Sequence, residues 1–272
     1  EPITLNVRDF GAFGDGVHDD TSAIQAAILC CPEKARVLIP KGTYPVTALF
    51  LKSDMILELQ ENAVLAGIYD RARTPILPGQ IEYDNEDGYY NLGSWEGNPI
   101  DSFASMITGI HVKNVTICGK GVLDGRADFE NWWSRPKDKI RAWRPRMIFL
   151  NHCENITVVG VTVQNSPAWN LHPYFSNQIR FLDMEVKGPA NSHNTDGCDP
   201  ESCTNVEIAG VHFSVGDDCI AIKSGKIYMG KKFKVPSKHI HIRQSWMQDG
   251  HGAVTVGSEI AAGVDDIHIS KC

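Results

Sequence analysis

Two acidic motifs and one histidine motif gather residue types that transfer protons. Asp196 lies in Asn194-Thr195-Asp196-Gly197, Asp217 and Asp218 lie in Gly216-Asp217-Asp218-Cys219, and His251 lies in Gly250-His251-Gly252. Carboxylates that lie close together repel each other, so one of them tends to keep its proton. A protonated acid beside an ionised base suits acid/base chemistry on a glycosidic bond. Each motif taken alone is also a common turn sequence, so the prediction rests on their convergence.

The elements that must position these side chains form a repeat. An Asn, His, Asp or Gln precedes alternating apolar and polar residues, and the first apolar residues of the copies are Val115, Ile156, Ile179, Val206, Ile240 and Ile267. Alternation with period two predicts strands with one buried face. The irregular intervals of 23 to 41 residues between copies favour a parallel β-solenoid, in which each coil covers the next. A β-sandwich is disfavoured because hairpin signals such as Asp-Gly are sparse between the copies.

The position of each motif within its coil predicts that the motifs meet. Asp217 and His251 each follow the first apolar residue of their copy by 11 residues, and Asp218 follows by 12. Equal positions in neighbouring coils place side chains above one another, about 4.8 Å apart. Asp196 follows its own marker by 17 residues, a difference that a loop can absorb. The sequence therefore predicts one site that contains Asp196, Asp217, Asp218 and His251.

Other segments suggest how the solenoid begins, widens and ends. Residues 22–29 carry apolar residues at helical spacing after Asp19, Asp20 and Thr21, so we expect a helix that covers the open edge of the first coil. Residues 70–102 are rich in Gly, Pro, Tyr and acids, and they predict a long loop over one side. The last strand pattern ends close to Cys272. We therefore expect a single domain over 1–272 that lacks the C-terminal coils of a longer protein.

Composition excludes several classes of protein. A net charge of −7 and a pI of about 5.8 argue against general nucleic-acid binding, and the apolar runs are too short for a membrane helix. The eight cysteines include no C-x-x-C pair, so we expect buried free thiols and no structural metal, with a Cys203–Cys219 bond left open. The sequence starts at Glu1 without an apolar leader, which leaves the compartment open.

The motifs, taken in order on this repeat, resemble the polygalacturonase family of glycoside hydrolases. Flanking strings strengthen the resemblance: Asn165-Ser166-Pro167-Ala168-Trp169, His172-Pro173, Asp199-Pro200-Glu201-Ser202 and the opening Phe10-Gly11-Ala12-Phe13-Gly14-Asp15-Gly16. The resemblance implies an all-β fold, a right-handed parallel β-helix with an N-terminal capping α-helix. It also implies hydrolysis of α-1,4-linked galacturonic acid in pectin with inversion, without a covalent intermediate, metal or cofactor.

The resemblance implies a role for each acid. Asp217 would protonate the leaving oxygen, Asp218 and Asp196 would hold the attacking water, and His251 would tune the acid and contact substrate. The family also uses an Arg-x-Lys pair beyond the histidine to bind the substrate carboxylate. This sequence contains no such pair after His251, so its activity without that pair is an open question.

Candidate substrate-binding residues are Asn194, Lys223 and Arg144. Because the substrate is a polyanion and the protein is acidic, local cations must receive it. Strict strand alternation predicts that Lys223 faces away from Asp218. Arg144 belongs to a basic stretch with tryptophans, 132–146, which is alternatively a charged loop over packed aromatic rings. Trp169 and His172 are expected to pack beneath the cleft.

Several functional alternatives stay open at this point. The long loop predicts exo action if it closes one end of the cleft. Rhamnogalacturonan or xylogalacturonan hydrolysis, a Ca²⁺-dependent pectate lyase and an inactive carbohydrate-binding β-helix are the other candidates. The expected partner is a pectic polysaccharide or oligogalacturonide, with no nucleic acid and no membrane, and the expected state is a monomer. The resemblance implies an extracellular or periplasmic location, and the sequence leaves a cytoplasmic one open.

Overall fold

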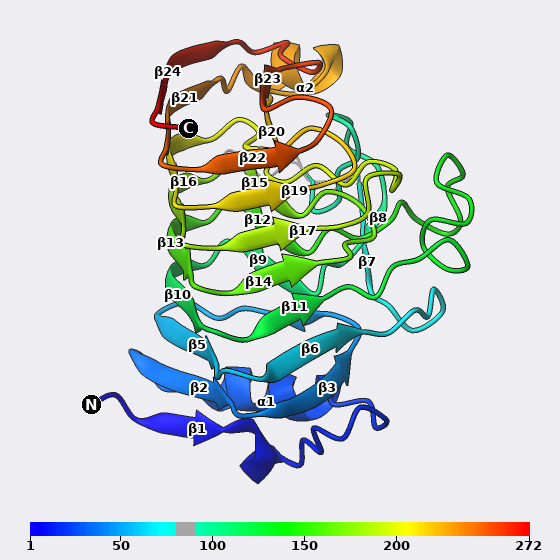
Figure 1. Ribbon diagram of the computed structural model, residues 1–272, viewed down its shortest axis with the longest axis vertical. Coiled ribbons are helices and arrows are strands. Elements are labelled where there is room, and N and C mark those ends of the chain that lie inside the picture. The colour runs from blue at the N-terminus through cyan, green and yellow to red at the C-terminus, as the bar shows by residue number, and fades with distance from the viewer. Residues whose placement is uncertain (80–90) are drawn as a thin grey trace.

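The chain folds as a parallel β-helix. A computed structural model describes residues 1–79 and 91–272. Successive coils stack along the long axis, and three parallel sheets run side by side along it (Figure 1). The all-β solenoid predicted from the repeat is therefore confirmed.

The first sheet contains nine strands, one from almost every coil. Its order is β1 (Thr4–Asn6), β2 (Ala35–Ile39), β5 (Met55–Leu59), β10 (Lys113–Gly119), β13 (Glu154–Val159), β16 (Asn177–Leu182), β18 (Thr204–Ala209), β21 (Ser237–Arg243) and β24 (Val264–Ser270). The second sheet contains seven: β3 (Gly42–Val46), β6 (Ala63–Gly67), β11 (Val122–Asp124), β14 (Thr162–Gln164), β17 (Glu185–Lys187), β19 (His212–Ser214) and β22 (Trp246–Asp249).

The third sheet carries the residues of interest. Its strands are β4 (Leu49–Phe50), β9 (Ile107–Ile110), β12 (Ile148–Asn151) and β15 (Leu171–Tyr174), and it continues into β20 (Ile220–Ile222) and β23 (Val254–Val256). Single bridges from Leu171 to Cys198 and from Cys198 to Ile220 join the two parts. A short antiparallel pair, β7 (Ile76–Leu77) with β8 (Ser102–Phe103), lies outside the coils.

The predicted markers pair with one another in register. Val115 lies opposite Ile156, which lies opposite Ile179, and the row continues through Val206, Ile240 and Ile267. Each of these strands sends alternate side chains into the core between the three sheets. Burial of those side chains fixes the register, because a slip of one residue would turn every apolar side chain outward.

Backbone conformation and hydrogen bonding explain why a polar residue precedes each marker. Asn114, Asn155 and Asn205 have φ values of 58°, 55° and 58°, in the left-handed region that Asn tolerates better than most residues. Their amides also bond from coil to coil: Asn155 Nδ2 donates to Asn114 Oδ1 at 2.9 Å, and Asn114 Nδ2 donates to Asp54 Oδ1 at 2.9 Å. The repeat thus encodes the corner of each coil as well as its strand.

The predicted helix is present as α1 (Thr21–Cys30), after a short 3₁₀ helix, η1 (Val7–Phe10). Ile24, Ala27 and Ile28 of α1 belong to the core. The Asp20 carboxylate accepts hydrogen bonds from the N–H groups of Phe13 and Gly14 instead of capping α1. A second helix, α2 (Ile227–Phe233), was not expected. Neither helix in the described part of the chain is long and apolar enough to span a membrane.

The predicted loop over 70–102 covers the outer face of the third sheet. Residues 80–90 of it lie outside the described residues. Leu77 and Leu92 pack with Phe149 and Tyr174 of the third sheet. Asn151 Nδ2 donates to the Asn91 carbonyl at 2.9 Å. The loop therefore rests on buried contacts with two strands.

Replacing Asn155 tests the corner position. We expect Asn155→Ala to lower the free energy of unfolding by about 2 kcal/mol, because it loses amide bonds worth ~0.5–1.5 kcal/mol each and a residue suited to positive φ. Asn155→Gly keeps the backbone conformation accessible and should lose about half as much. Urea unfolding measures both variants, with the exposed Glu154→Ala as the control. Equal losses for Ala and Gly would show that backbone conformation does not matter here.

Candidate active site

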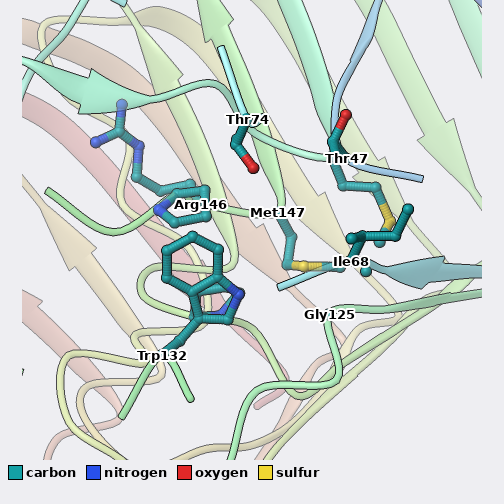
Figure 2. Close-up of a pocket in the computed structure, with 11 residues that line it drawn as sticks. Thr47, Ile68, Thr74, Gly125, Trp132, Arg146 and Met147 are labelled. Atoms are coloured by element: carbon teal, nitrogen blue, oxygen red, sulfur yellow. The ribbon is translucent and has the colours of Figure 1, made fainter. Parts of the chain in front are cut away.

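The predicted acids line one open cleft on the third sheet. The cleft has a volume of about 440 Å³, and its lining residues are Glu96, Trp169, Asn194, Asp196, Asp217, Asp218, Lys223, Thr255, Val256, Gly257, Ser258 and Glu259. Figure 2 shows a second, much smaller hollow of about 20 Å³ between Thr47, Thr74, Trp132 and Met147. That hollow is too small for a sugar and shares no lining residue with the cleft.

Backbone hydrogen bonds between coils bring the three motifs together. Gly197 N donates to Asp218 O, and His251 N donates to Asp217 O, each at 2.9 Å. Gly216 N donates to the Thr195 hydroxyl at 3.2 Å. As a result, one carboxylate oxygen from each of Asp196, Asp217 and Asp218 lies within 4.8 Å of the others. The convergence predicted from coil position is what the structure shows.

Glycines in the motifs allow this close approach. A Cβ atom at Gly197 would lie 2.3 Å from the Cys219 carbonyl oxygen and equally close to the Phe213 ring. A Cβ atom at Gly252 would lie 2.9 Å from Asp218 Oδ1. Gly197 therefore has to be glycine for the coils to approach this closely, whereas a side chain at Gly252 would displace the Asp218 carboxylate and the Thr255 hydroxyl.

Asp217 and His251 are the accessible pair. The Asp217 side chain is 27% exposed and the His251 side chain 68% exposed, with 3.4 Å between Asp217 Oδ1 and His251 Nδ1. Asp218 N donates to the same Asp217 oxygen at 2.9 Å and fixes its orientation. Asp217 thus presents a carboxyl group to the cleft with an imidazole beside it.

Asp196 and Asp218 lie in less polar surroundings. Asp196 is only 4% exposed, and burial, reinforced by the negative charge of Asp217, raises its pKa to about 7. Burial and the charge of Asp217 also raise the pKa of Asp218, while the Thr255 hydroxyl and the Lys223 ammonium oppose that rise. Burial, reinforced by the crowding of like charges, therefore raises the pKa of both carboxyls above their ordinary range.

Lys223 is buried, and its charge is already paired. Its ammonium lies 2.6 Å from Glu259 Oε2, donates to the Gly257 carbonyl at 3.0 Å, and sits 5.1 Å from the centre of the Trp169 ring. The prediction that Lys223 faces away from Asp218 is wrong, because both residues line the cleft. Strict alternation fails just before β20, where the consecutive residues Cys219 and Ile220 both enter the core.

A layer of buried ionisable groups lies beneath the cleft. Burial raises the pKa of Asp199 well above its usual range and that of Glu201 to about 7. His172 Nε2 lies 2.9 Å from Glu201 Oε1, and burial lowers the pKa of this imidazole. The Asp199 carboxyl is hydrogen bonded to the Asp196 carboxyl, which adds to the rise that burial causes in the pKa of Asp199 and opposes the rise in that of Asp196. His172 therefore packs beneath the cleft as expected, whereas Trp169 lines it.

Arg144 contacts Asn194 and not the open cleft. The guanidinium donates to Asn194 Oδ1 at 2.6 Å and to the carbonyls of Pro167 and His193 at 2.7 and 2.8 Å. Burial lowers its pKa to about 10. Arg144 is not a lining residue of the cleft, whereas Asn194 is. The structure therefore shows Arg144 holding the position of a cleft residue.

The rest of the basic stretch matches its simpler interpretation. Trp132 and Trp133 are buried, Trp143 stacks on Trp95, and Arg135 pairs with Asp138 at the surface. From Arg135 to Arg141 the stretch is a charged surface loop over packed aromatic rings, whereas Arg146 is buried over the Phe149 ring.

Sequence reasoning missed Glu259 and Glu96. In the register of β20 with β23, Gly257 follows β23 as Lys223 follows β20, so the repeat gives no signal for Glu259 further along the chain. Glu96 arrives from the loop, where no repeat guides prediction. Asp196, Asp217 and Asp218 also offer oxygen ligands of the kind that Ca²⁺ prefers.

The comparisons with known proteins agree on one family. The profile of glycosyl hydrolases family 28 matches residues 77–272, and a rhamnogalacturonase A/epimerase, pectate lyase-like profile matches residues 4–132. A "Probable polygalacturonase" of Vitis vinifera is 32% identical over 97% of this chain and 53% of its own length. An exo-poly-alpha-D-galacturonosidase of Dickeya chrysanthemi is 28% identical over 98% of this chain and 49% of its own length. The chain thus spans about half the length of these relatives.

Solved structures extend the likeness to the fold. The chain superposes on an exopolygalacturonase from Thermotoga maritima with a TM-score of 0.84 and 28% identity, covering 98% of this chain and 65% of that one. A family 28 exopolygalacturonase from Yersinia enterocolitica gives a TM-score of 0.78 and 26% identity, covering 100% and 53%. With the profile matching most of the chain, this protein belongs to glycosyl hydrolases family 28.

Proposed function

We propose that this protein hydrolyses the α-1,4 linkage between galacturonic acid units of pectic polymers. The observation that carries the proposal is the meeting of Asp196, Asp217 and Asp218 in one open cleft, with His251 beside Asp217. The names of the relatives, which include exo- and endo-polygalacturonases, support the same substrate class. Inversion at the anomeric carbon is the course that the family resemblance implies.

Each carboxyl group fits a different step. Asp217 protonates the leaving oxygen, because it is exposed to the cleft and has His251 beside it. Asp218 and Asp196 orient the attacking water and accept its proton. A general acid or base works best when its pKa lies near the working pH, and Asp196 with a pKa of about 7 meets that condition.

Substrate binding divides between direct and indirect contacts. Asn194 faces the cleft and contacts the sugar, and Arg144 fixes its amide. Lys223 attracts the substrate carboxylate through its charge, although Glu259 partly neutralises that charge.

The loop closes one end of the cleft and makes the action exo. Trp95 stacks on Trp143 with ring centres 4.9 Å apart, and Glu96 lines the cleft beside Glu259. Lys226 N donates to the Gly97 carbonyl at 3.2 Å, which joins the loop to the segment before α2. A wall here would admit one chain end and block a continuous polymer.

The partner is a pectic polysaccharide or oligogalacturonide, and the enzyme acts as a monomer outside the cell or in the periplasm. The 1–272 segment acts as a single β-helix domain.

The first test is Asp217→Asn assayed by release of reducing sugar from polygalacturonate. We expect a loss of about 10²–10⁴-fold, which is the range for a general acid. The exposed Asp249→Asn, outside the cleft, is the matched control and should keep full activity. Unchanged turnover in Asp217→Asn would refute the assignment. An unsaturated product that disappears with chelator would identify a lyase instead.

Product analysis tests exo action. We expect short products of constant length from the first minutes of reaction, while the viscosity of polygalacturonate falls slowly, because each cut removes only a chain end. Viscosity that falls faster than reducing ends accumulate would show endo action. A panel with rhamnogalacturonan and xylogalacturonan defines the preferred polymer.

Asp199→Asn should stabilise the fold as pH rises. The folded pKa of Asp199 is raised, so the unfolded state loses its proton first, and stability falls as pH rises above about 4. Asparagine does not titrate, so the variant avoids this loss of stability. The loss grows by about 1.4 kcal/mol per pH unit between the unfolded and folded pKa values of Asp199. Thermal melts at about pH 4 and pH 8 measure it, with Asp249→Asn as the control. A gain that is equal at both pH values would contradict the mechanism.

A further inference from the structure

The first sheet carries a cluster of histidines that the proposed hydrolysis does not use. His239 and His241 lie on β21, and Asp266 and His268 lie on β24, which pairs with β21 in parallel. None of the four lines the cleft, which lies on the third sheet. All come from two copies of the repeat, His239-Ile240-His241-Ile242 and Asp266-Ile267-His268-Ile269.

These two coils depart from the earlier ones at two positions. The corner position holds Asn155, Gln178 and Asn205 in earlier coils, and then changes to His239 and Asp266 with the same positive φ. The outward position two residues later pairs in register along the sheet and holds Thr157, Arg180, Glu207, His241 and His268 in order. Imidazole and carboxylate groups therefore replace amides at the corner position, and two imidazoles follow Thr, Arg and Glu at the outward position.

The donor atoms lie close enough to share an ion. His241 and His268 are register partners with ring centres 5.0 Å apart, and one donor atom each from His241, Asp266 and His268 lies within 4.8 Å of the other two. Zinc–ligand bonds of about 2.0–2.2 Å place tetrahedral donor atoms about 3.5 Å apart. The donor atoms therefore have to move closer together by about 1 Å. Because all these side chains are exposed, small rotations can supply that closure.

We propose that His241, Asp266 and His268 bind a divalent transition-metal ion of the Zn²⁺ class, and that His239 orients the Asp266 carboxylate. Two imidazoles and one carboxylate form a donor set that binds Zn²⁺ in preference to Ca²⁺ or Mg²⁺. Such a set leaves the fourth tetrahedral position for water.

Existing contacts already resemble a metal site with its supporting shell. His268 Nε2 lies 2.6 Å from Asp266 Oδ1, and His239 Nδ1 hydrogen bonds the other oxygen, Oδ2. A histidine–carboxylate contact of this kind fixes the ligand's orientation. The nearest guanidinium on β21, that of Arg243, is paired with Glu207 Oε1 at 2.6 and 2.9 Å, so its charge is offset. A bound ion would join β21 to β24.

Equilibrium dialysis of the chelator-treated chain with Zn²⁺ at about pH 7.5 tests the proposal. We expect one Zn²⁺ per chain at this site, no competition from Mg²⁺, and a higher melting temperature with Zn²⁺. Co²⁺ in place of Zn²⁺ should give the visible absorption of a tetrahedral complex. His241→Gln/His268→Gln should abolish the absorption and weaken binding, and His239→Phe should weaken binding by about 10–100-fold.

Two control variants separate this site from other metal-binding groups. The variant His111→Gln/His152→Gln removes another pair of stacked imidazole rings, which belongs to neither metal-compatible group found in the described part of the chain. This variant should bind Zn²⁺ like the parent. Asp196→Asn/Asp217→Asn removes the carboxylate group of the cleft and should leave the Co²⁺ spectrum unchanged. Zn²⁺ binding that survives His241→Gln/His268→Gln, or that is lost only in the cleft variant, would overturn the proposal.

Discussion

The parallel pairing of each coil with the next is the constraint on which the rest of the structure depends. The row from Val115 to Ile267 fixes the register, and the register fixes which residues of different coils meet. Asp196, Asp217 and His251 are far apart in the sequence, yet two backbone hydrogen bonds between coils suffice to bring their segments together. A one-residue slip would separate the motifs and expose the core at once. The same strand register therefore determines both the stability of the fold and the geometry of the site.

The buried ionisable groups of the site destabilise the fold. Asp199, Glu201 and Asp196 lie buried close to one another, and burial raises the pKa of each. Lys223 is the cation that lowers the pKa values of all three, and it also pairs with Glu259. Buried charge without full compensation destabilises a fold, and such groups are tolerated where they tune reactive neighbours. The core of apolar side chains around them supplies the stability that this layer removes.

Prediction from the sequence succeeds for the repeated coils and fails where the repeat is interrupted. The six markers and the convergence of the acids followed from period-two alternation and equal positions in neighbouring coils, and helix α1 followed from apolar residues at helical spacing. Helix α2 lies in an insertion between coils, and nothing in its short Lys-rich sequence distinguishes it from a loop. Glu96 comes from the long loop, whose path depends on packing against Phe149 and Tyr174. The side to which Lys223 points was mispredicted because Cys219 and Ile220 break the alternation, a local event that periodicity does not encode.

The order of the coils has a consequence for how this protein fails under stress. In a solenoid each coil contacts only its neighbours, so opening proceeds inward from an end and does not involve all coils together. Asp196 lies between β17 and β18, whereas His251 lies between β22 and β23, so the two residues belong to different coils. Opening of the coil that carries His251 and Glu259 would dismantle the cleft while the strands beneath Asp196 stayed paired. Loss of the complete cleft would then precede loss of β-structure, and the two would not coincide on heating.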